Sequence, residues 1–411
     1  MLTKEQKIEF NNILDELGNS LDISETQFNA AVASYNAVGG WLTKDDSLLK
    51  PYSPKVLPQG SIVLGTIIKP IHKDDDLDLD LVCQLSGKNP LWTQKDVKNI
   101  VGNQIASHKA LDSRLDVEGR RCWTLKYREG SKNDDKYHMD ILPSIVSSSY
   151  SIILEKSMLS NFSNENTDKL AIRITDKESD DYSWNPDTED WLKSNPFGYA
   201  IWFLDRAEIG FEKSIRLRES IKPVPKFQTK KLPLQRAVQI LKRHRDMMFQ
   251  GDKDKPISAI ITTLAGYAYL KERDVFDTLL GVIDRMENYI EERFDYEKGK
   301  YIKYIPNPVN PEENFADKWA DNPQKEKNFK NWLAAVKRDI NGASELKGTY
   351  RIKESLSMSF GDDVVNTTFT NIGNKARILT EQGNNRFDTK LGITATGANI
   401  IKPHNFYGNN E

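Results

Sequence analysis

The sequence predicts an α+β protein with two lobes, and three observations support this fold class. Short β-type runs such as LDLDLVCQL, CWTLKY and YHMDILPSIV lie within residues 56–150. Helical patterns precede them in the first fifty residues and follow them from residue 197 to about 340. The chain has 411 residues, enough for two or three domains of roughly 150 residues each. We therefore expect a mixed-sheet core beside a helical lobe.

The first half of the chain divides into two segments. Residues 1–50 are expected to be N-terminal helices, because TKEQ at Thr3 and SETQ at Ser24 are capping-box sequences. Residues 51–195 are expected to form the α/β core, with one helix that Thr93 caps.

The second half also divides into two segments. Residues 196–345 are expected to form the helical lobe, with helices at 197–215, 233–250, 256–272, 275–293 and 324–340. Residues 346–411 are polar, rich in Asn, Thr and Gly, and show only weak strand-like alternation, so they are expected to be a polar, partly ordered C-terminal tail.

Composition and charge exclude several classes of protein. With 38% hydrophobic residues, no apolar run near the roughly 20 residues of a membrane span, and no signal-peptide pattern, the chain is expected to be cytoplasmic, with no membrane partner. Cys83 and Cys122 have no second ligand at metal spacing, which argues against a structural zinc. The net charge of -2 does not suit a nucleic-acid coat, although residues 213–245 hold eleven Lys or Arg and could meet a polyanion.

An acidic run, DDDLDLDLV at residues 74–82, suggests a metal site. In a strand, Asp78 and Asp80 project from one face while the leucines take the other. Asp140, in YHMDILPS, is a third carboxylate on a separate strand, and such a set supplies the oxygen ligands that two Mg²⁺ ions require. Acidic runs are more often solvated, and a pair formed by Asp76 and Asp78 is an alternative register.

Gly60 and Ser61 lie upstream of this acidic run. A glycine lets the backbone approach phosphate oxygens, and a serine hydroxyl with nearby amide donors can hold them. Gly-Ser is common in turns, but it is far more specific when followed by alternating aspartates and then by a separate apolar-flanked aspartate.

With these motifs the sequence resembles the polymerase-β-like nucleotidyltransferase superfamily. It is most similar to the bacterial relatives of cyclic GMP-AMP synthase and oligoadenylate synthase, the DncV-like nucleotidyltransferases (CD-NTases). The landmarks run in order from about residue 59 to 319: QGSIVLGTIIKP, DDDLDLDLV, HMDILPS, NPFGYAIWFLDR, LPLQRAVQILKRHRD, KPISAIITTLAGYAY and IPNPVNPEENFADKW. Members of this family join nucleoside triphosphates into cyclic di- or trinucleotides, second messengers of anti-phage (CBASS-type) defence.

The resemblance implies a polymerase-β-like core and a helical lobe with the active site in the cleft between them. Asp78, Asp80 and Asp140 would be the catalytic residues and would hold two Mg²⁺ ions, with Mn²⁺ as an alternative. Asp140 would also help to activate the attacking ribose hydroxyl. The nucleotide-binding residues would be Gln59, Gly60, Ser61, Lys242 and Ser258. A short helix should follow Gly60, despite the β-branched residues of SIVLGTII.

The resemblance also bears on partners and neighbouring residues. Nucleoside triphosphates, with ATP among them, are the expected substrates; the zinc insertion of the animal DNA sensor is missing, so DNA activation is not implied. A regulatory protein could bind the helical half. We expect Tyr199 to be core, Asn314 to line the cleft, His138 to share the Asp140 face in a supporting role, and His244 to lie at the surface or near phosphate.

Two alternatives remain open at this level. The chain could be another nucleotidyltransferase that acts on RNA or protein, by tailing or adenylylation. It could also be a catalytically silent nucleotide-binding scaffold, although the three aspartates and Gly-Ser are intact. The bases, the linkage and the ring size are not encoded in any motif.

Overall fold

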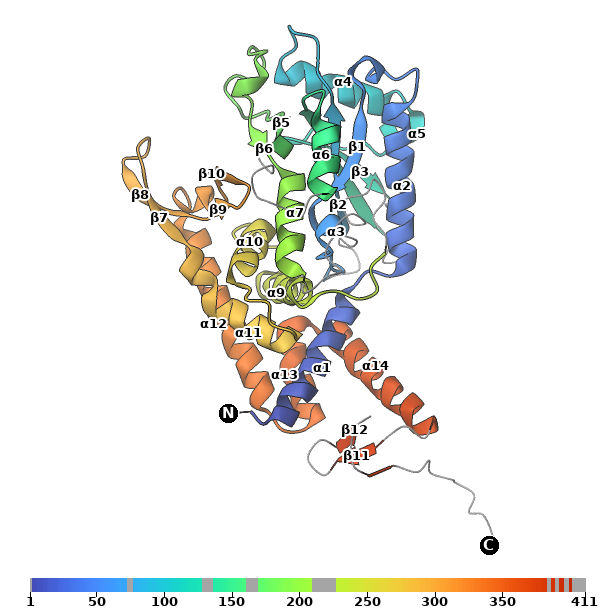
Figure 1. Cartoon of the computed structure of the whole chain (residues 1–411), viewed down its shortest axis with the longest axis vertical. Coiled ribbons are helices and arrows are strands. Elements are labelled where there is room, and N and C mark those ends of the chain that lie inside the picture. Colours follow the sequence, from blue (N-terminus) through green and yellow to red (C-terminus); the bar gives the residue numbers. More distant parts are fainter. Residues whose placement is uncertain are drawn as a thin grey trace.

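The computed structural model has a sheet-containing lobe, at the top of Figure 1, and a helical lobe below it. The structure describes residues 2–71, 77–127, 136–159, 169–208 and 227–382, with short strands at 386–388, 392–394 and 399–400. The α+β prediction is confirmed. In the described part of the chain, no helix combines the length and apolarity that a membrane crossing needs.

The main sheet is mixed. Its strands lie in the order β1 (Lys55–Gln59), β2 (Leu77–Leu85), β4 (Tyr137–Ile145), β5 (Ile172–Ile174) and β6 (Lys193–Ser194), and β3 (Trp123–Tyr127) also pairs with β4. The central pair β2 and β4 is parallel, whereas the other neighbours are antiparallel. The two longest strands of this sheet therefore run side by side in the same direction.

The two faces of the sheet bury different sets of helices. Leu77, Leu79 and Leu81 pack with α2 (Glu25–Thr43) and α4 (Gln94–Ala106) in one apolar core. Val82 and Leu142 belong to the other core, which includes α3 (Gly60–Leu64), α6 (Tyr150–Leu159), α7 (Pro196–Ala207) and the helical lobe. Because side chains alternate along a strand, the even-numbered residues of β2 face the helical lobe. A short helix, α5 (Lys109–Asp112), follows α4.

The helical lobe is built around α9 (Pro233–Phe249), which contacts α1 (Lys4–Leu21), α10 (Ser258–Ala268), α11 (Val275–Arg285) and α12 (Pro323–Glu345). Leu234, Val238 and Leu241, spaced at i, i+4 and i+7 along α9, are fully buried. Arg236 and Arg243 are buried as well, bonded to the Gly18 carbonyl, Asp22 and the carbonyls of Pro70 and Phe360. In the described part of the basic stretch, Arg236, Lys242, Arg243 and Arg245 therefore bond to this chain's own oxygens.

The two N-terminal helices belong to different lobes. Thr3 and Ser24 form the predicted capping boxes, as does Thr93 before α4. Helix α1 packs on α14 (Asp362–Glu381), α9 and α11 of the helical lobe, whereas α2 packs on β1 and α4 of the core. The loop between α1 and α2 therefore joins the lobes a second time.

Two predicted helices end early. Helix α7 stops at Ala207, and the remainder of the predicted segment lies outside the described residues. Helix α11 stops at Arg285 and is followed by a 3-10 helix, Met286–Tyr289, and by a hairpin of β7 (Glu291–Asp295) and β8 (Lys300–Tyr304). A glycine with φ of +63° at position 299 permits the turn between them, and Phe294 pairs with Tyr301 across it. Strands β9 (Pro306–Asn307) and β10 (Asn310–Asn314) come next.

The prediction of a polar tail with weak strand-like alternation is wrong for residues 349–381. They form α13 (Thr349–Phe360) and α14, which pack against α12, α9 and α1. Ile352, Leu356 and Phe360 repeat every four residues and are buried. Three short strands follow, β11 (Arg386–Asp388), β12 (Gly392–Thr394) and β13 (Asn399–Ile400). One buried residue per turn is enough to pack α13 against the lobe, because α12 and α9 cover the face that carries these residues.

Candidate active site

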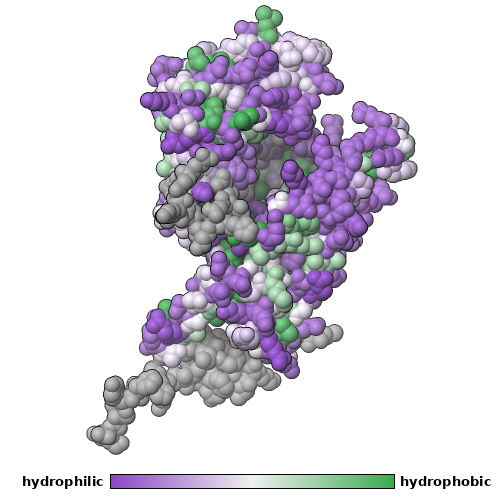
Figure 2. Space-filling view, turned by 180° about the vertical axis from the view of Figure 1, so that it is seen from behind, coloured by the Kyte–Doolittle hydropathy of each residue, from purple (hydrophilic) through white to green (hydrophobic). Residues whose placement is uncertain are grey.

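A cleft of about 740 Å³ lies between the two lobes, and its lining comes from both. Figure 2 shows the surface hollowed between the sheet-containing lobe and the helical lobe. Seven of the predicted site residues line this cleft: Gln59, Gly60, Ser61, Asp78, Asp80, Lys242 and Ser258. Residues far apart in the sequence therefore meet here, as the resemblance implied. Asp140 belongs to the strand beside Asp80.

The three aspartates share the sheet face that looks toward the helical lobe. In the parallel register, Asp80 stands beside Asp140 and Asp78 beside His138. Asp78, His138 and Asp140 each place one potential ligand atom within 4.8 Å of the others, and His138 Nε2 is 3.2 Å from Asp78 Oδ1. His138 thus shares the face of Asp140, as predicted. The alternative Asp76 register lies outside the described residues.

The carboxylates repel one another electrostatically. Burial, together with the negative charges of Asp78 and Asp140, raises the pKa of Asp80 to about 8. The pKa of Asp140 is also raised, first by burial and then by Asp78, even though the Thr124 hydroxyl donates a hydrogen bond of 2.5 Å to Asp140 Oδ1. Oxygen ligands with clustered negative charge suit a hard divalent cation such as Mg²⁺, so this donor set fits the metal that the resemblance implies.

Gly60 lies directly against Asp80. Its φ is +65°, and a Cβ at this position would come within 2.3 Å of Asp80 Oδ2. Only glycine satisfies both conditions, because other residues rarely adopt this φ and would displace the carboxylate. The following residues form α3, so the short helix is confirmed despite the β-branched side chains. Val63 and Leu64 of this helix are buried, and this packing outweighs local β propensity.

Lys242 supplies positive charge from the helical lobe. It is 7% exposed, and its Nζ donates a 3.0 Å hydrogen bond to the Thr66 carbonyl. Burial lowers its pKa to about 8, with Arg245 contributing in the same direction, while Asp78 and Asp80 act in the opposite direction. The Lys242 ammonium therefore interacts electrostatically with the carboxylates of Asp78 and Asp80 across the cleft.

Ser258 is the first residue of α10, and Arg245 contacts it. Arg245 Nη1 donates to Ser258 Oγ at 2.9 Å and also lines the cleft. Our sequence reasoning missed Arg245, although it lies three residues after Lys242 and therefore on the same helix face. His244, by contrast, is buried against Phe360, with its Nε2 3.2 Å from Asp339 Oδ2. The prediction of a surface or phosphate-adjacent His244 is wrong, because it points into the lobe.

Part of the remaining lining comes from α7 and the β9–β10 region. Tyr199 packs partly buried against the core, as expected, and it also lines the cleft, together with Asn307, Glu313 and Phe315. Asn314 was expected there, yet its side chain accepts from the Ile305 amide and donates to the Lys303 carbonyl. Within this landmark, the neighbouring residue Glu313 is the one at the cleft.

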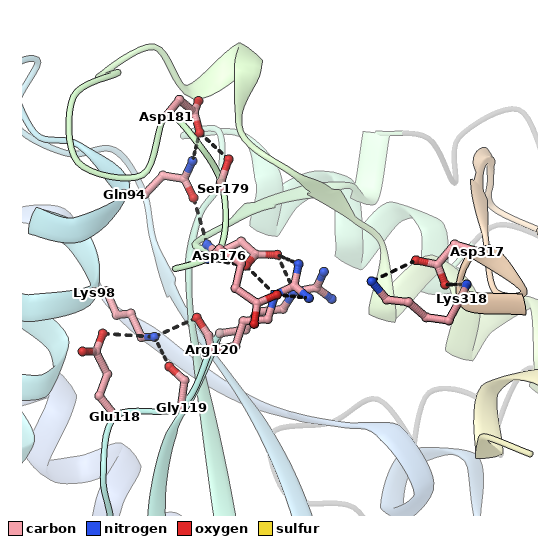
Figure 3. A network of polar contacts seen from close by, with 12 residues as sticks. Gln94, Lys98, Glu118, Gly119, Arg120, Asp176, Ser179, Asp181, Asp317 and Lys318 are labelled. Atoms are coloured by element: carbon pink, nitrogen blue, oxygen red, sulfur yellow. Dashed lines mark hydrogen bonds and ion pairs between the residues drawn. The ribbon is translucent and has the colours of Figure 1, made fainter. Parts of the chain in front are cut away.

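A polar network surrounds the loop that leads into β3 (Figure 3). Lys98, fully buried on α4, lies 3.2 Å from Glu118 and bonds to the carbonyls of Gly119 and Arg120. Arg120 also pairs with Asp176 at 2.6 Å. These contacts anchor the loop that leads into β3, the strand whose Thr124 holds Asp140. The orientation of Asp140 therefore depends on residues outside the cleft.

Comparisons with known proteins agree with this geometry. Residues 54–143 match the model of the cyclic GMP-AMP synthase DncV-like nucleotidyltransferase domain. A c-di-GMP synthase of Roseivirga ehrenbergii is 28% identical over 425 residues, covering 99% of this chain and all of that protein. The cyclic dinucleotide synthase CdnG of Bradyrhizobium diazoefficiens is 21% identical, covering 86% of this chain and 80% of that protein. The solved structure of that CdnG in complex with GTP superposes with a TM-score of 0.64 at 19% identity, covering 89% of this chain and 99% of that one.

Proposed function

We propose a function from the premise that this chain belongs to the bacterial DncV-like nucleotidyltransferases and has their polymerase-β-like fold. It joins two nucleoside triphosphates into a cyclic dinucleotide. The observation that carries the proposal is the grouping of Asp78, Asp80 and Asp140 on adjacent parallel strands. Asp80 lies against Gly60, and Asp78 and Asp80 line a cleft large enough for nucleotides.

The proposed chemistry is two successive phosphoryl transfers in one cleft. Asp78, Asp80 and Asp140 would hold two Mg²⁺ ions, with Mn²⁺ as an alternative; when bound, the ions would neutralise the triphosphate and lower the pKa of the attacking hydroxyl. In each transfer a ribose hydroxyl oxygen bonds to the α-phosphorus of the other nucleotide, and pyrophosphate leaves. Asp140, oriented by Thr124, would take the hydroxyl proton.

The two lobes would hold the donor triphosphate from opposite sides. Gln59, Gly60 and Ser61 bind it from the core, while Lys242 and Ser258 bind it from the helical lobe. A bound phosphate would give the buried Lys242 ammonium an anionic partner in addition to the neutral Thr66 carbonyl. Because burial strengthens electrostatic attraction, Lys242 would attract the triphosphate more strongly than an exposed lysine. Substrate binding would therefore draw the two lobes together.

The relatives favour guanine nucleotides among the substrates. One relative is a c-di-GMP synthase, and the other is a cyclic dinucleotide synthase solved with GTP. We therefore propose a guanine-containing cyclic dinucleotide as the product and anti-phage signalling as its role. The cytoplasmic location, the regulatory partner and the absence of DNA activation remain predictions.

The test is product analysis. The purified protein is incubated with ATP, GTP, CTP and UTP plus Mg²⁺ or Mn²⁺, treated with phosphatase, and analysed by mass spectrometry. A phosphatase-resistant cyclic dinucleotide that disappears in a variant carrying Asp78→Asn and Asp80→Asn supports the proposal. Transfer of labelled nucleotide only to added RNA or protein would favour the tailing or adenylylating alternative, and binding without any transfer would favour the scaffold.

A further inference from the structure

The β9–β10 region presents a carboxylate to the cleft that the chemistry proposed above does not use. Glu313, on β10, is half-buried and lines the cleft beside Asn307 of β9. Asn307 Nδ2 donates to Glu313 Oε2 at 2.7 Å, and Asn307 Oδ1 accepts from the Val309 amide at 3.1 Å. Because the second contact fixes which end of the amide is nitrogen, Asn307 can only donate to Glu313.

The environment keeps this carboxylate available to a ligand. Across the described ranges, no cation forms an ion pair with Glu313, and Asn307 is its only hydrogen-bond partner. Asn307 is 4% exposed and engages Glu313 through Oε2. A carboxylate has about four acceptor positions, so most of the capacity of Glu313 is unused within the described structure. Among the residues that the structure describes, the Asn307 amide is the one hydrogen-bond donor to this carboxylate, which faces the cleft.

Aromatic side chains flank the same part of the cleft. Tyr199 of α7 and Phe315, which follows β10, both line it, with ring centroids 6.2 Å apart in an edge-to-face arrangement. The Tyr199 hydroxyl is engaged with Thr263 Oγ1 at 2.8 Å, which holds the ring in place. Rings of this kind bind nucleobases by stacking, whichever base is presented, because every base has a π-face. Stacking alone would therefore not select a base.

We propose that Glu313 recognises the nucleobase by hydrogen bonding and selects guanine in one of the two nucleotide positions. The inference rests on the proposed function and names its substrate more narrowly. Guanine presents two adjacent donors, N1–H and N2–H, which match the two oxygens of a carboxylate. Adenine presents a ring nitrogen acceptor beside its amino group, and the lone pair of that nitrogen would face a carboxylate oxygen. Cytosine has the same donor-and-acceptor pattern as adenine, and uracil has a single donor between two acceptors.

The selection has a physical basis in desolvation. A charged acceptor that leaves water must be paired, and guanine pairs it with two charge-assisted hydrogen bonds. Adenine would leave one carboxylate oxygen opposite an acceptor. A bidentate match of this kind gives a preference of about tenfold or more for the correct base.

The test uses Glu313→Gln, with Glu312→Gln as the matched control. Glutamine keeps an oxygen that can accept from Asn307, so the β9–β10 contact survives the change, and Glu312 is an exposed neighbour. Binding of nonhydrolysable GTP and ATP analogues is measured by calorimetry with Mg²⁺ on the full chain, and thermal unfolding checks that each variant is folded. The wild type and Glu312→Gln should prefer the GTP analogue by at least about tenfold.

Glu313→Gln should erase or reverse this preference, because an amide can donate to the adenine ring nitrogen and accept from its amino group. A wild-type protein without a preference for the GTP analogue would overturn the inference. So would a folded Glu313→Gln variant that retains the preference. If cyclic products form while this binding pattern fails, only the guanine inference is lost; if the binding pattern holds but no cyclic product forms, only the proposed function is lost.

Discussion

Replacing Asp80 by Asn should make the metal-free protein more stable while abolishing nucleotide transfer. Burial and the charges of Asp78 and Asp140 raise the Asp80 pKa to about 8, so the folded state disfavours the ionised carboxylate. Asparagine has nearly the same shape and no charge, and it therefore removes this penalty. It also removes a proposed ligand of the metal ions.

The size of the effect follows from the pKa shift. The pKa of the carboxyl is its ordinary value of 3.8 in the unfolded chain and about 8 in the folded protein. Because the folded pKa is the higher one, the penalty is absent at pH values below the unfolded pKa and grows as the pH rises to the folded pKa. At pH 7 the pH is about three units above the unfolded pKa, and each unit lowers the free energy of unfolding by about 1.36 kcal/mol. The destabilisation by Asp80 is therefore at most about 4 kcal/mol. Water in the open cleft and the shared titration with Asp78 and Asp140 reduce this destabilisation. We therefore expect Asp80→Asn to raise the free energy of unfolding by about 2 kcal/mol at pH 7.

The assay is urea unfolding in EDTA at pH 4 and pH 7, with Asp180→Asn as the control at an exposed site. Asp80→Asn should raise the free energy of unfolding at pH 7 and change it little at pH 4, and the control should do neither. Added Mg²⁺ should stabilise the wild type more than Asp80→Asn. An Asp80→Asn variant that is no more stable than wild type at pH 7 would show that the carboxylates do not repel one another as argued.

Three further predictions address other parts of the structure. Lys242→Met should weaken triphosphate binding by about 1.5–3 kcal/mol in calorimetry, whereas Lys230→Met, at an exposed position, should change it little; equal losses in both variants would mean that only diffuse charge matters. Because the pKa of Lys242 is about 8 and a bound phosphate favours its protonated form, the affinity of the wild type for triphosphate should fall above pH 8. Gly60→Ala should abolish product formation, since its Cβ would meet the neighbouring carboxylate at 2.3 Å; near-normal turnover would contradict this. Phe360→Ala should destabilise the protein by about 3–5 kcal/mol in urea unfolding, because Phe360 is fully buried, and Met358→Ala, at 78% exposure, should be neutral; a small loss in the first variant would mean that α13 adds little to the fold.

Local patterns predicted the parts of the site that lie within single elements. The alternation in DLDLV identified a strand with Asp78 and Asp80 on one face, and β2 has that arrangement. The capping sequences at Thr3, Ser24 and Thr93 marked helix starts correctly. Such signals are readable because side-chain direction and end capping depend on neighbours within a few residues.

The tertiary structure decided which elements cover one another and which side chains reach the cleft. Apolar residues recur at helical spacing within residues 349–381, but their burial depends on α12, α9 and α1, which cover α13 and α14. Arg236 is buried because α1 brings the Gly18 carbonyl and Asp22 to it from more than two hundred residues away. Periodicity shows which face of an element is apolar, but the partner of that face depends on the whole chain. For the same reason, Glu313 stands at the cleft while its neighbour Asn314 turns inward.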